Sequence, residues 1–188
     1  MLMGGRLDLP RPARADVPPH LVMTMLTADI GPATEADLDG IVALQAANQP
    51  DRGGTLSGSL PRARIAELMR EMPVIVARRG GRVVAFLMTG TRGMSADVPL
   101  VGAMFAAYGG AANGYVYGPV CVAAAERGQG LAQAMFAELR RLAPGREGIL
   151  FIRRDNSASL RAHHKMGMRE VASFSHDGRE FAVLSYIG

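Results

Sequence analysis

The middle of the chain reads Tyr115-Val116-Tyr117-Gly118-Pro119-Val120-Cys121-Val122, and three alanines separate this stretch from Glu126-Arg127-Gly128-Gln129-Gly130. The first stretch is apolar and predicts a buried strand, whereas Leu131 begins an amphipathic helix directly after the glycines. The unpaired N–H groups and the dipole at the start of a helix attract anions. Glycine has no Cβ, so a phosphate can approach the backbone closely there. The order of strand, turn and helix therefore predicts a site for a phosphate-bearing cofactor.

The composition of the chain fits one globular domain. It has 188 residues, of which 48% are hydrophobic, so it can bury a substantial core. In residues 1–24, prolines alternate with arginines and no apolar period is present, so we expect this segment to form a disordered tail. Residues 25–188 then make up the single folded domain.

Charge and cysteine content restrict the partners and the compartment. The net charge is +4, but there is no basic run, no Trp and only 5% aromatic residues, so nucleic-acid binding is not expected. No apolar run reaches membrane-spanning length, and prolines interrupt the place where the core of a signal peptide would lie. Cys121 is the only cysteine, which rules out an internal disulfide and favours a reducing cytoplasm.

Strand and helix patterns alternate along the rest of the sequence. Apolar runs predict strands over residues 26–30, 74–77, 83–88, 115–122, 149–152, 171–174 and 181–186. Helical spacing and capping residues predict helices that begin near Thr34, Pro61, Val98, Gly130 and Asn156. The helix over residues 130–142 is expected to bury Leu131, Ala134, Met135, Leu139 and Leu142. Turns at residues 79–82 and 177–178 predict two hairpins, and the whole pattern indicates an α/β fold.

Two other nucleotide-binding motifs compete for the glycine turn. Gly128 and Gly130 supply the first two glycines of a dinucleotide fingerprint, and Glu147 lies near the expected acidic position. However, Gln133 stands where the third glycine is needed, and Glu147 precedes a predicted strand instead of ending one. The Lys-Ser/Thr pair of a P-loop is also absent. Both alternatives are therefore disfavoured.

Placed on these elements, the residues carry a resemblance to the GNAT superfamily of N-acetyltransferases over residues 26–187. Its strongest part is Arg127-Gly128-Gln129-Gly130-Leu131-Ala132, which fits the family signature Arg/Gln-x-x-Gly-x-Gly/Ala. The second part is Asn156, followed seven residues later by His163 and then by Lys165-Met166-Gly167-Met168. Family members usually have Asn, then Tyr at the seventh position, then Gly and an aromatic residue. The two motifs together, in this order, are specific.

The resemblance implies a GNAT-like acyl-CoA N-acyltransferase fold, with a central mixed sheet of six or seven strands flanked by helices on both faces. It also implies acetyl-CoA as cosubstrate, without a metal. In the family, the pantetheine arm lies along the strand before the signature, the pyrophosphate lies on the turn, and the next strand splays away. The residues thereby implied in cofactor binding are Val120, Cys121, Val122, Arg127, Gly128, Gln129, Gly130, Leu131, Ala132, Gln133, Asn156 and His163. The backbone N–H of Val122 is expected to support the oxyanion.

His163 stands where the family's tyrosine protonates the leaving CoA thiolate. A free thiol titrates near ~8.5 and histidine near ~6.5, so an imidazole can act as this general acid, although it is shorter than tyrosine. The other interpretation is a histidine on the helix surface or at its cap, favoured by the dipole near the C-terminal end of the helix. Asn156 lies nearly two turns earlier on the same side of that helix, and it also suits the N-cap.

The general base is not identified by the sequence. The strand over 149–152 has no carboxylate, and Glu126 lies beside the expected phosphates. Tyr115 and Tyr117 alternate onto one face of the central strand, and Tyr117 is a candidate to order a water or to contact substrate, but half-buried strand aromatics are the preferred interpretation of both. Cys121 has no acidic or histidine neighbour in sequence, so we interpret it as a buried structural cysteine and not as an acetyl carrier.

The predicted function is direct transfer of the acetyl group of acetyl-CoA to a primary amine of a small molecule or peptide. Another nucleophile or another acyl-CoA is the nearest alternative reaction. A non-catalytic, regulatory CoA-binding module of the same fold is the alternative of a different class, because the usual tyrosine and a strand carboxylate are missing. The acceptor is expected to contact residues 47–61 and 90–114, and the sequence leaves open whether the protein is a homodimer.

Overall fold

The structure is a computed structural model that describes residues 27–188 except residue 57. The predicted tail over residues 1–24 and the first residue of the first predicted strand lie outside the described residues. Seven strands form one sheet in the order β1-β2-β3-β4-β5-β7-β6. Only β4 and β5 are parallel to each other, so the sheet is mixed, as predicted. The strands are β1 Asp29–Pro32, β2 Ile75–Arg79, β3 Arg82–Gly90, β4 Tyr115–Val122, β5 Glu147–Arg153, β6 Arg169–His176 and β7 Arg179–Ile187.

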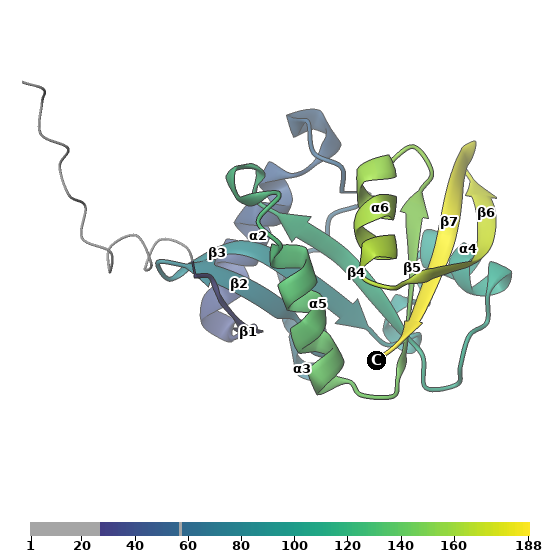
Figure 1. The fold of residues 1–188 in the computed structure, drawn as a ribbon, viewed down its shortest axis with the longest axis horizontal. Coiled ribbons are helices and arrows are strands. Elements are labelled where there is room, and N and C mark those ends of the chain that lie inside the picture. Colours follow the sequence, from purple (N-terminus) through teal and green to yellow (C-terminus); the bar gives the residue numbers. More distant parts are fainter. Residues whose placement is uncertain (1–26, 57) are drawn as a thin grey trace, which may run out of the picture.

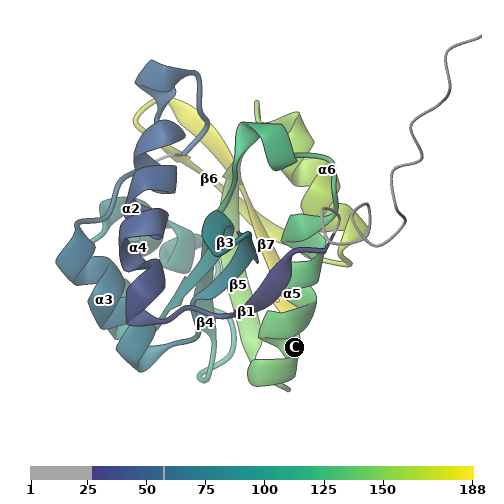
Figure 2. The same ribbon diagram turned by 90° about the vertical axis from the view of Figure 1, so that its left-hand side faces the viewer.

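Helices cover both faces of this sheet, which confirms the predicted arrangement (Figure 1). Figure 2 shows α2, α3 and α4 on one side of the sheet and α5 and α6 on the other. The helices are α2 Leu38–Ala47, α3 Arg62–Glu71, α4 Pro99–Ala107, α5 Leu131–Leu142 and α6 Ser157–Lys165. Short 3-10 turns are η1 Glu35–Asp37, η2 Pro50–Arg52, η3 Gly93–Ser95 and η4 Ala124–Glu126.

Helix α5 packs its apolar side into the core on its face of the sheet. Leu131, Met135 and Leu139 are buried there, as predicted. Ala134 is exposed, so the prediction that it is buried was wrong. Its place in the core is taken by Phe136, which lies on the other flank of the helix and packs edge-on against Tyr117 and Tyr186. The aromatic partners on β4 and β7 therefore set the rotation of this helix.

The first strand lies further along the chain than its apolar residues predict. The prediction was 26–30, whereas β1 spans Asp29–Pro32 and pairs Asp29 with Arg78 of β2. Arg78 donates to Asp37 at 2.7 and 2.6 Å, and Thr34 forms a capping box with Asp37 as predicted for a helix start. The buried Asp37 carboxylate thus ties the start of the first helical segment to the sheet.

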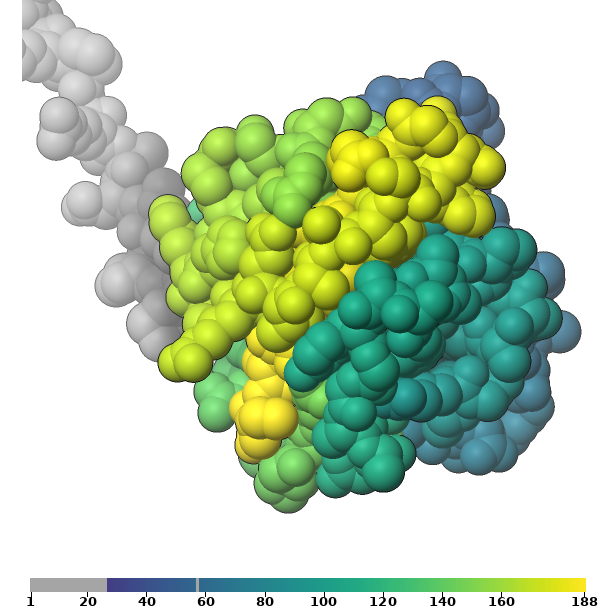
Figure 3. All heavy atoms as spheres, turned by 90° about the vertical axis from the view of Figure 1, so that its right-hand side faces the viewer, coloured from purple at the N-terminus to yellow at the C-terminus, as the bar shows by residue number. Residues whose placement is uncertain are grey.

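Helix α4 and its flanking loops occupy residues 91–114, between β3 and β4. The helix lies against β6 on the sheet face that α2 and α3 also cover (Figure 2). Figure 3 shows the teal atoms of this segment beside the yellow atoms of the C-terminal strand. The carboxylate of Glu147 fixes the end of this segment, because it accepts bonds from Tyr108 Oη at 3.0 Å, from the Ala111 N–H and from the Ser185 hydroxyl. Burial alone would raise the pKa of Glu147, but these hydrogen bonds lower it. Glu147 is the first residue of β5, so the expectation that it precedes the strand was wrong.

Candidate active site

The parallel pair at the centre of the sheet separates soon after it begins. Strands β4 and β5 pair only at Tyr115↔Gly148 and Val116↔Ile149. The remainder of β4, from Tyr117 to Val122, therefore has β3 on one side and, within residues 27–56 and 58–188, no paired strand on the other. This is the splay that the family resemblance implies.

Val120 and Val122 turn their backbone groups toward this gap. Val122 lies opposite Ala85 of β3, and the next residue, Ala123, donates its N–H to Val84 O at 2.9 Å. In an antiparallel ladder, bonded and non-bonded pairs alternate, so Val122 belongs to a non-bonded pair. Val120, opposite Leu87, has the same phase. Their N–H and C=O groups thus point away from β3, to the side from which β5 has separated.

The same alternation places Cys121 away from the gap. Its backbone faces β3, and its buried side chain packs into the core beneath α2 and α3. Burial raises the pKa of its thiol to about 12, so the thiol stays protonated at neutral pH. The prediction of a structural cysteine agrees with this environment. The implied contact of Cys121 with the cofactor has no direct route in this structure.

The glycine turn leads from β4 into α5 with open space beside it. Gly128 and Gly130 have φ of 78° and 77°, in the left-handed region that favours glycine, and a Cβ on either would meet nothing within 4 Å. Gly130 is the N-cap of α5. The N–H groups that begin this helix lie next to unfilled space, so the turn has room for a phosphate. The side chain of Leu131 is buried in the core, so only its backbone is available to such a ligand.

Side chains around the turn hold it in place. Gln129 accepts from Arg79 Nη2 at 2.9 Å, and Arg79 Nη1 lies 3.2 Å from the Glu126 carboxylate. Arg127 donates from Nη2 to Asn48 Oδ1 at 2.8 Å and from Nε to Val122 O at 3.3 Å. Arg127 therefore reaches across to the end of α2 instead of lying over the turn. Sequence reasoning missed Asn48 and Arg79, because each meets the turn only through tertiary packing.

His163 and Tyr117 meet on the α5 and α6 face of the sheet. Their ring centroids are 5.7 Å apart and the rings are perpendicular. His163 is buried, and its Nδ1 lies 2.8 Å from Ser159 O, so Nδ1 carries the proton and donates it to that carbonyl. Burial lowers the pKa of His163 below its ordinary value. The hydrogen bond to Ser159 O acts in the opposite direction, and the neighbouring His164 lowers the pKa further. The imidazole is therefore neutral at pH 7.

The Tyr117 hydroxyl is buried and has no hydrogen-bond partner within the described part of the chain. Burial raises its pKa, so it keeps its proton. Tyr117 is the first residue of β4 beyond the last pair with β5. Tyr115 lies on the same face, as predicted, but its hydroxyl bonds to that of Tyr186.

Asn156 caps α6. Its side-chain oxygen accepts the N–H of Ser159 at 3.1 Å, which confirms the N-cap interpretation. Whether it also contacts a cofactor stays a prediction, as it does for Ala132, which is half-buried, and for Gln133, which is exposed on α5.

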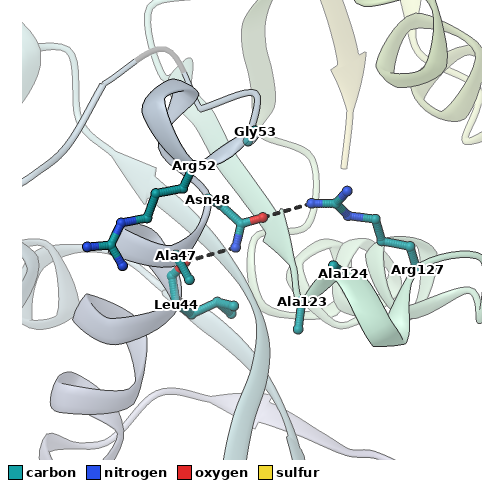
Figure 4. A pocket seen from close by; sticks show the side chains of 9 residues that line it. Leu44, Ala47, Asn48, Arg52, Gly53, Ala123, Ala124 and Arg127 are labelled. Carbon is teal, nitrogen blue, oxygen red and sulfur yellow. Dashed lines mark hydrogen bonds between the residues drawn. The ribbon is translucent and has the colours of Figure 1, made fainter.

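A small cavity adjoins the turn on the α2 side of β4. Its volume is about 190 Å³, and its walls come from the end of α2, the turn after it, and the residues that follow Val122 (Figure 4). Figure 4 shows Arg127 extending toward Asn48 across this space, while Arg52 runs outward at the rim. We call it the Asn48 cavity, lined by Leu44, Ala47, Asn48, Arg52, Gly53, Gly54, Ala123, Ala124 and Arg127.

Two kinds of site are not found among residues 27–56 and 58–188. None of the helices there has the length and apolar character needed to span a bilayer. No group of three or more His, Cys, Asp or Glu side chains in this part of the chain could hold a metal ion.

Comparison with known proteins identifies the class. Residues 42–168 match the model of the acetyltransferase (GNAT) family, which is more than half of the chain. The chain therefore belongs to the GNAT acetyltransferase family. No curated protein matches it significantly in sequence.

Solved structures share its fold at low identity. An N-acetyltransferase from Staphylococcus aureus Mu50 matches with a TM-score of 0.64 and 19% identity, covering 86% of this chain and 98% of that one. The ribosomal-protein-alanine N-acetyltransferase of Brucella melitensis matches with a TM-score of 0.61 and 22% identity, covering 84% and 98%. A GNAT-superfamily phosphinothricin acetyltransferase of Sinorhizobium meliloti, in complex with acetyl-CoA, matches with a TM-score of 0.61 and 17% identity, covering 86% and 88%. These likenesses define the GNAT fold.

Proposed function

We propose that this protein is an N-acetyltransferase that transfers the acetyl group of acetyl-CoA directly to a primary amine of a small molecule or peptide. The observation that carries the proposal is the free side of β4. From Tyr117 onward this strand has no paired strand on the β5 side in the described part of the chain, and it runs into a left-handed glycine turn and the start of α5. The thioester-bearing arm of acetyl-CoA needs a strand with a free side, and its diphosphate needs a helix start beyond the end of that strand.

The residues fit acetyl-CoA in three respects. The N–H groups of Val120 and Val122 are oriented to bond an extended amide-bearing arm along β4. The space beside Gly128 and Gly130 admits phosphates to the N–H groups that begin α5. The described residues contribute no carboxylate to this turn except Glu126, which Arg79 neutralises. Acetyl-CoA would supply the activated acetyl group, and the chain would supply its orientation.

We assign support of the carbonyl oxygen to the N–H of Val122. This group points into the gap, and a fixed donor directed at developing negative charge lowers the barrier without reorganisation. Correct positioning of amine and thioester contributes a further share of the rate.

We assign protonation of the departing thiolate to the His163–Tyr117 pair. His163 holds the family position, but at neutral pH its one ring proton is donated to Ser159 O. Tyr117 keeps its hydroxyl proton and has no partner for it among the described residues. Within the pair, Tyr117 is thus the residue with an uncommitted proton, and His163 packs against its ring; the burial that raises the pKa of Tyr117 makes its hydroxyl a weaker acid than that of a free tyrosine. No described carboxylate is assigned as base, because Glu147 already accepts three hydrogen bonds at the far end of β5.

The test combines binding and turnover. We expect acetyl-CoA to bind with saturable heat in calorimetry, and a panel of primary amines to release free CoA thiol in the presence of acetyl-CoA. Tight binding without turnover on any amine would support the alternative, a non-catalytic CoA-binding regulatory module, which the neutral His163 makes a serious second candidate. Absence of any binding would contradict both. A single buried thiol, Cys121, also supports a cytoplasmic setting for the reaction.

A further inference from the structure

The Asn48 cavity lies one residue from the proposed reaction centre. Ala123 and Ala124 line it, and they directly follow Val122. Its opposite wall is the end of α2 and the turn over residues 50–54. The cavity is therefore placed to hold part of an acceptor whose amine approaches the thioester. Its volume of about 190 Å³ is roughly six times the ~30 Å³ that a water takes in the liquid, so it admits a small polar group with a few carbons.

The charge of this cavity is positive and unbalanced. Arg52 and Arg127 line it, and its lining contains no acidic residue. The bonds of Arg127 go to neutral acceptors, the amide of Asn48 and the carbonyl of Val122. Arg52 is exposed and forms no ion pair within residues 27–56 and 58–188. Guanidinium groups bind carboxylates through paired, charge-assisted hydrogen bonds.

The turn that forms one wall has a fixed shape. Gly54 lies so close to Asn48 that a Cβ would come within 1.8 Å of Asn48 O, and Leu56 donates its N–H to the same oxygen. Gln45, which is buried, bonds both Ser59 Oγ and the backbone of Leu60. The segment is thus held at one end by backbone bonds to Asn48 and Gln49, which directly follow α2, and at the other end by the side chain of Gln45.

From these observations we infer that the acceptor is an amine that also carries a carboxylate, and that the Asn48 cavity holds this carboxylate against Arg127, with Arg52 at the rim. The inference rests on the proposed function and names the substrate class for it. The competing use of this charge is binding of the phosphates of CoA itself, because Arg127 directly precedes the glycine turn in sequence. Arg52 distinguishes the two uses, because it lies on the other side of Asn48 from Arg127 (Figure 4).

The experiment compares matched acceptors. Each pair is an ω-amino acid of three to six carbons and its primary amide, which differ in charge at the end remote from the amine. We expect the ratio of kcat/KM for acid over amide to exceed about tenfold for at least one length. Arg52→Ala should lower this ratio roughly threefold to tenfold, and Arg52→Glu should invert it. The matched control is Arg70→Glu on α3, an exposed arginine away from the cavity, which should leave the ratio unchanged.

Binding provides a second measurement that does not need turnover. Calorimetry of the acid against the CoA-loaded protein should show saturable binding that Arg52→Glu weakens and Arg70→Glu does not. Equal use of acids and amides would overturn the inference and leave the acetyltransferase intact. An Arg52→Glu variant that loses affinity for acetyl-CoA instead of acid preference would assign the charge to the cofactor and also overturn it. If no amine in the panel is acetylated, the proposed function fails, and acid binding alone then decides the inference.

Discussion

Arg127 Nη2 donates to Asn48 Oδ1 at 2.8 Å, and this bond joins the turn after β4 to the end of α2. The contact couples the two segments that the proposal assigns to cofactor and acceptor. We expect Asn48→Ala and Arg127→Ala to be non-additive in the free energy of unfolding by about 1 to 2 kcal/mol, the range that spans an ordinary hydrogen bond and one to a charged group. Denaturant titration of both single variants and the double variant measures this. As a control, the effects of Asn48→Ala and Arg70→Ala on the free energy of unfolding should be additive. Additive effects of Asn48→Ala and Arg127→Ala would mean that the bond is not formed in solution.

Substitution of Gly130 tests the phosphate turn. Gly130→Glu should abolish acetyl-CoA binding in calorimetry, because it places a large anion beside the helix start. The left-handed conformation also makes any side chain there cost about 1 kcal/mol. Gly145→Glu is the matched control, since Gly145 has φ of 69° and equally open surroundings away from the turn. It should lose similar stability and keep its affinity. Retained affinity in Gly130→Glu would remove the turn from the cofactor site.

Substitution of each tyrosine of β4 by phenylalanine distinguishes a catalytic hydroxyl from a structural one. Tyr117→Phe removes a buried hydroxyl that has no partner among the described residues, so stability should stay equal or rise while kcat falls by at least tenfold. Tyr115→Phe breaks the bond to the Tyr186 hydroxyl, so stability should fall by about 1 kcal/mol with little change in kcat. Steady-state kinetics and thermal unfolding of both variants decide. An unchanged kcat in Tyr117→Phe would exclude its hydroxyl as the donor, and His163→Phe would then test its neighbour.

Stability should depend on pH through His163. Its folded pKa is lowered from 6.5 by burial, so the unfolded chain binds a proton more readily than the folded one does. The contribution of His163 to the free energy of unfolding is present in full above pH 6.5. It is lost as the pH falls from 6.5 toward the lowered pKa that His163 has in the folded protein. We expect the free energy of unfolding to decline over this interval and His163→Phe to flatten the decline. An equal slope in both proteins would contradict the burial of a neutral imidazole.

Asp37 should act in a more acidic interval. The hydrogen bond from Arg78 lowers its pKa from 3.8 to about 2, against the effect of burial. The stabilisation is present above pH 3.8 and is lost as the pH falls toward 2, and it amounts to roughly 2 kcal/mol. Asp37→Asn should therefore cost about 2 kcal/mol at pH 7 and little at pH 2, as measured by denaturant titration at both values. The exposed Asp39, whose partner Arg62 is also exposed, provides the control and should change by less than about 1 kcal/mol.

The local signals of the sequence were sufficient for most of the elements. The hairpins at residues 79–82 and 177–178, the cap at Asn156 and the helix after Gly130 depend on residues close together in the chain, and the structure confirms them. The position of β1 does not depend on neighbouring residues alone. Its register is set by pairing with Arg78, almost 50 residues away in the chain. Ala134 was misjudged for the same reason, since aromatic rings on β4 and β7 select the face that α5 buries.

The candidate site was predictable where it follows one local motif. The glycine turn is encoded between Tyr115 and Leu131, whereas the free side of β4 was expected only from the family resemblance, because it depends on where β5 separates. The reach of Arg127 to Asn48, and the burial that keeps His163 neutral, depend on elements that only folding brings together. Whether the backbone of Cys121 faces the gap or faces β3 depends on its pairing with β3, and the sequence of β4 alone does not determine that pairing.

The early separation of β4 from β5 has a consequence for the mechanics of the molecule. Among the described residues, two residue pairs are the only backbone ladder between the part of the sheet that contains β1 to β4 and the part that contains β5, β7 and β6. Cohesion between the two parts must then come from side chains that cross between them, such as the Tyr115 and Tyr186 hydroxyls. Buried side chains such as Tyr115 and Tyr186 thus set the distance between the two parts of the sheet. A change in the volume of these side chains alters the width of the gap between β4 and β5 as well as the stability of the fold.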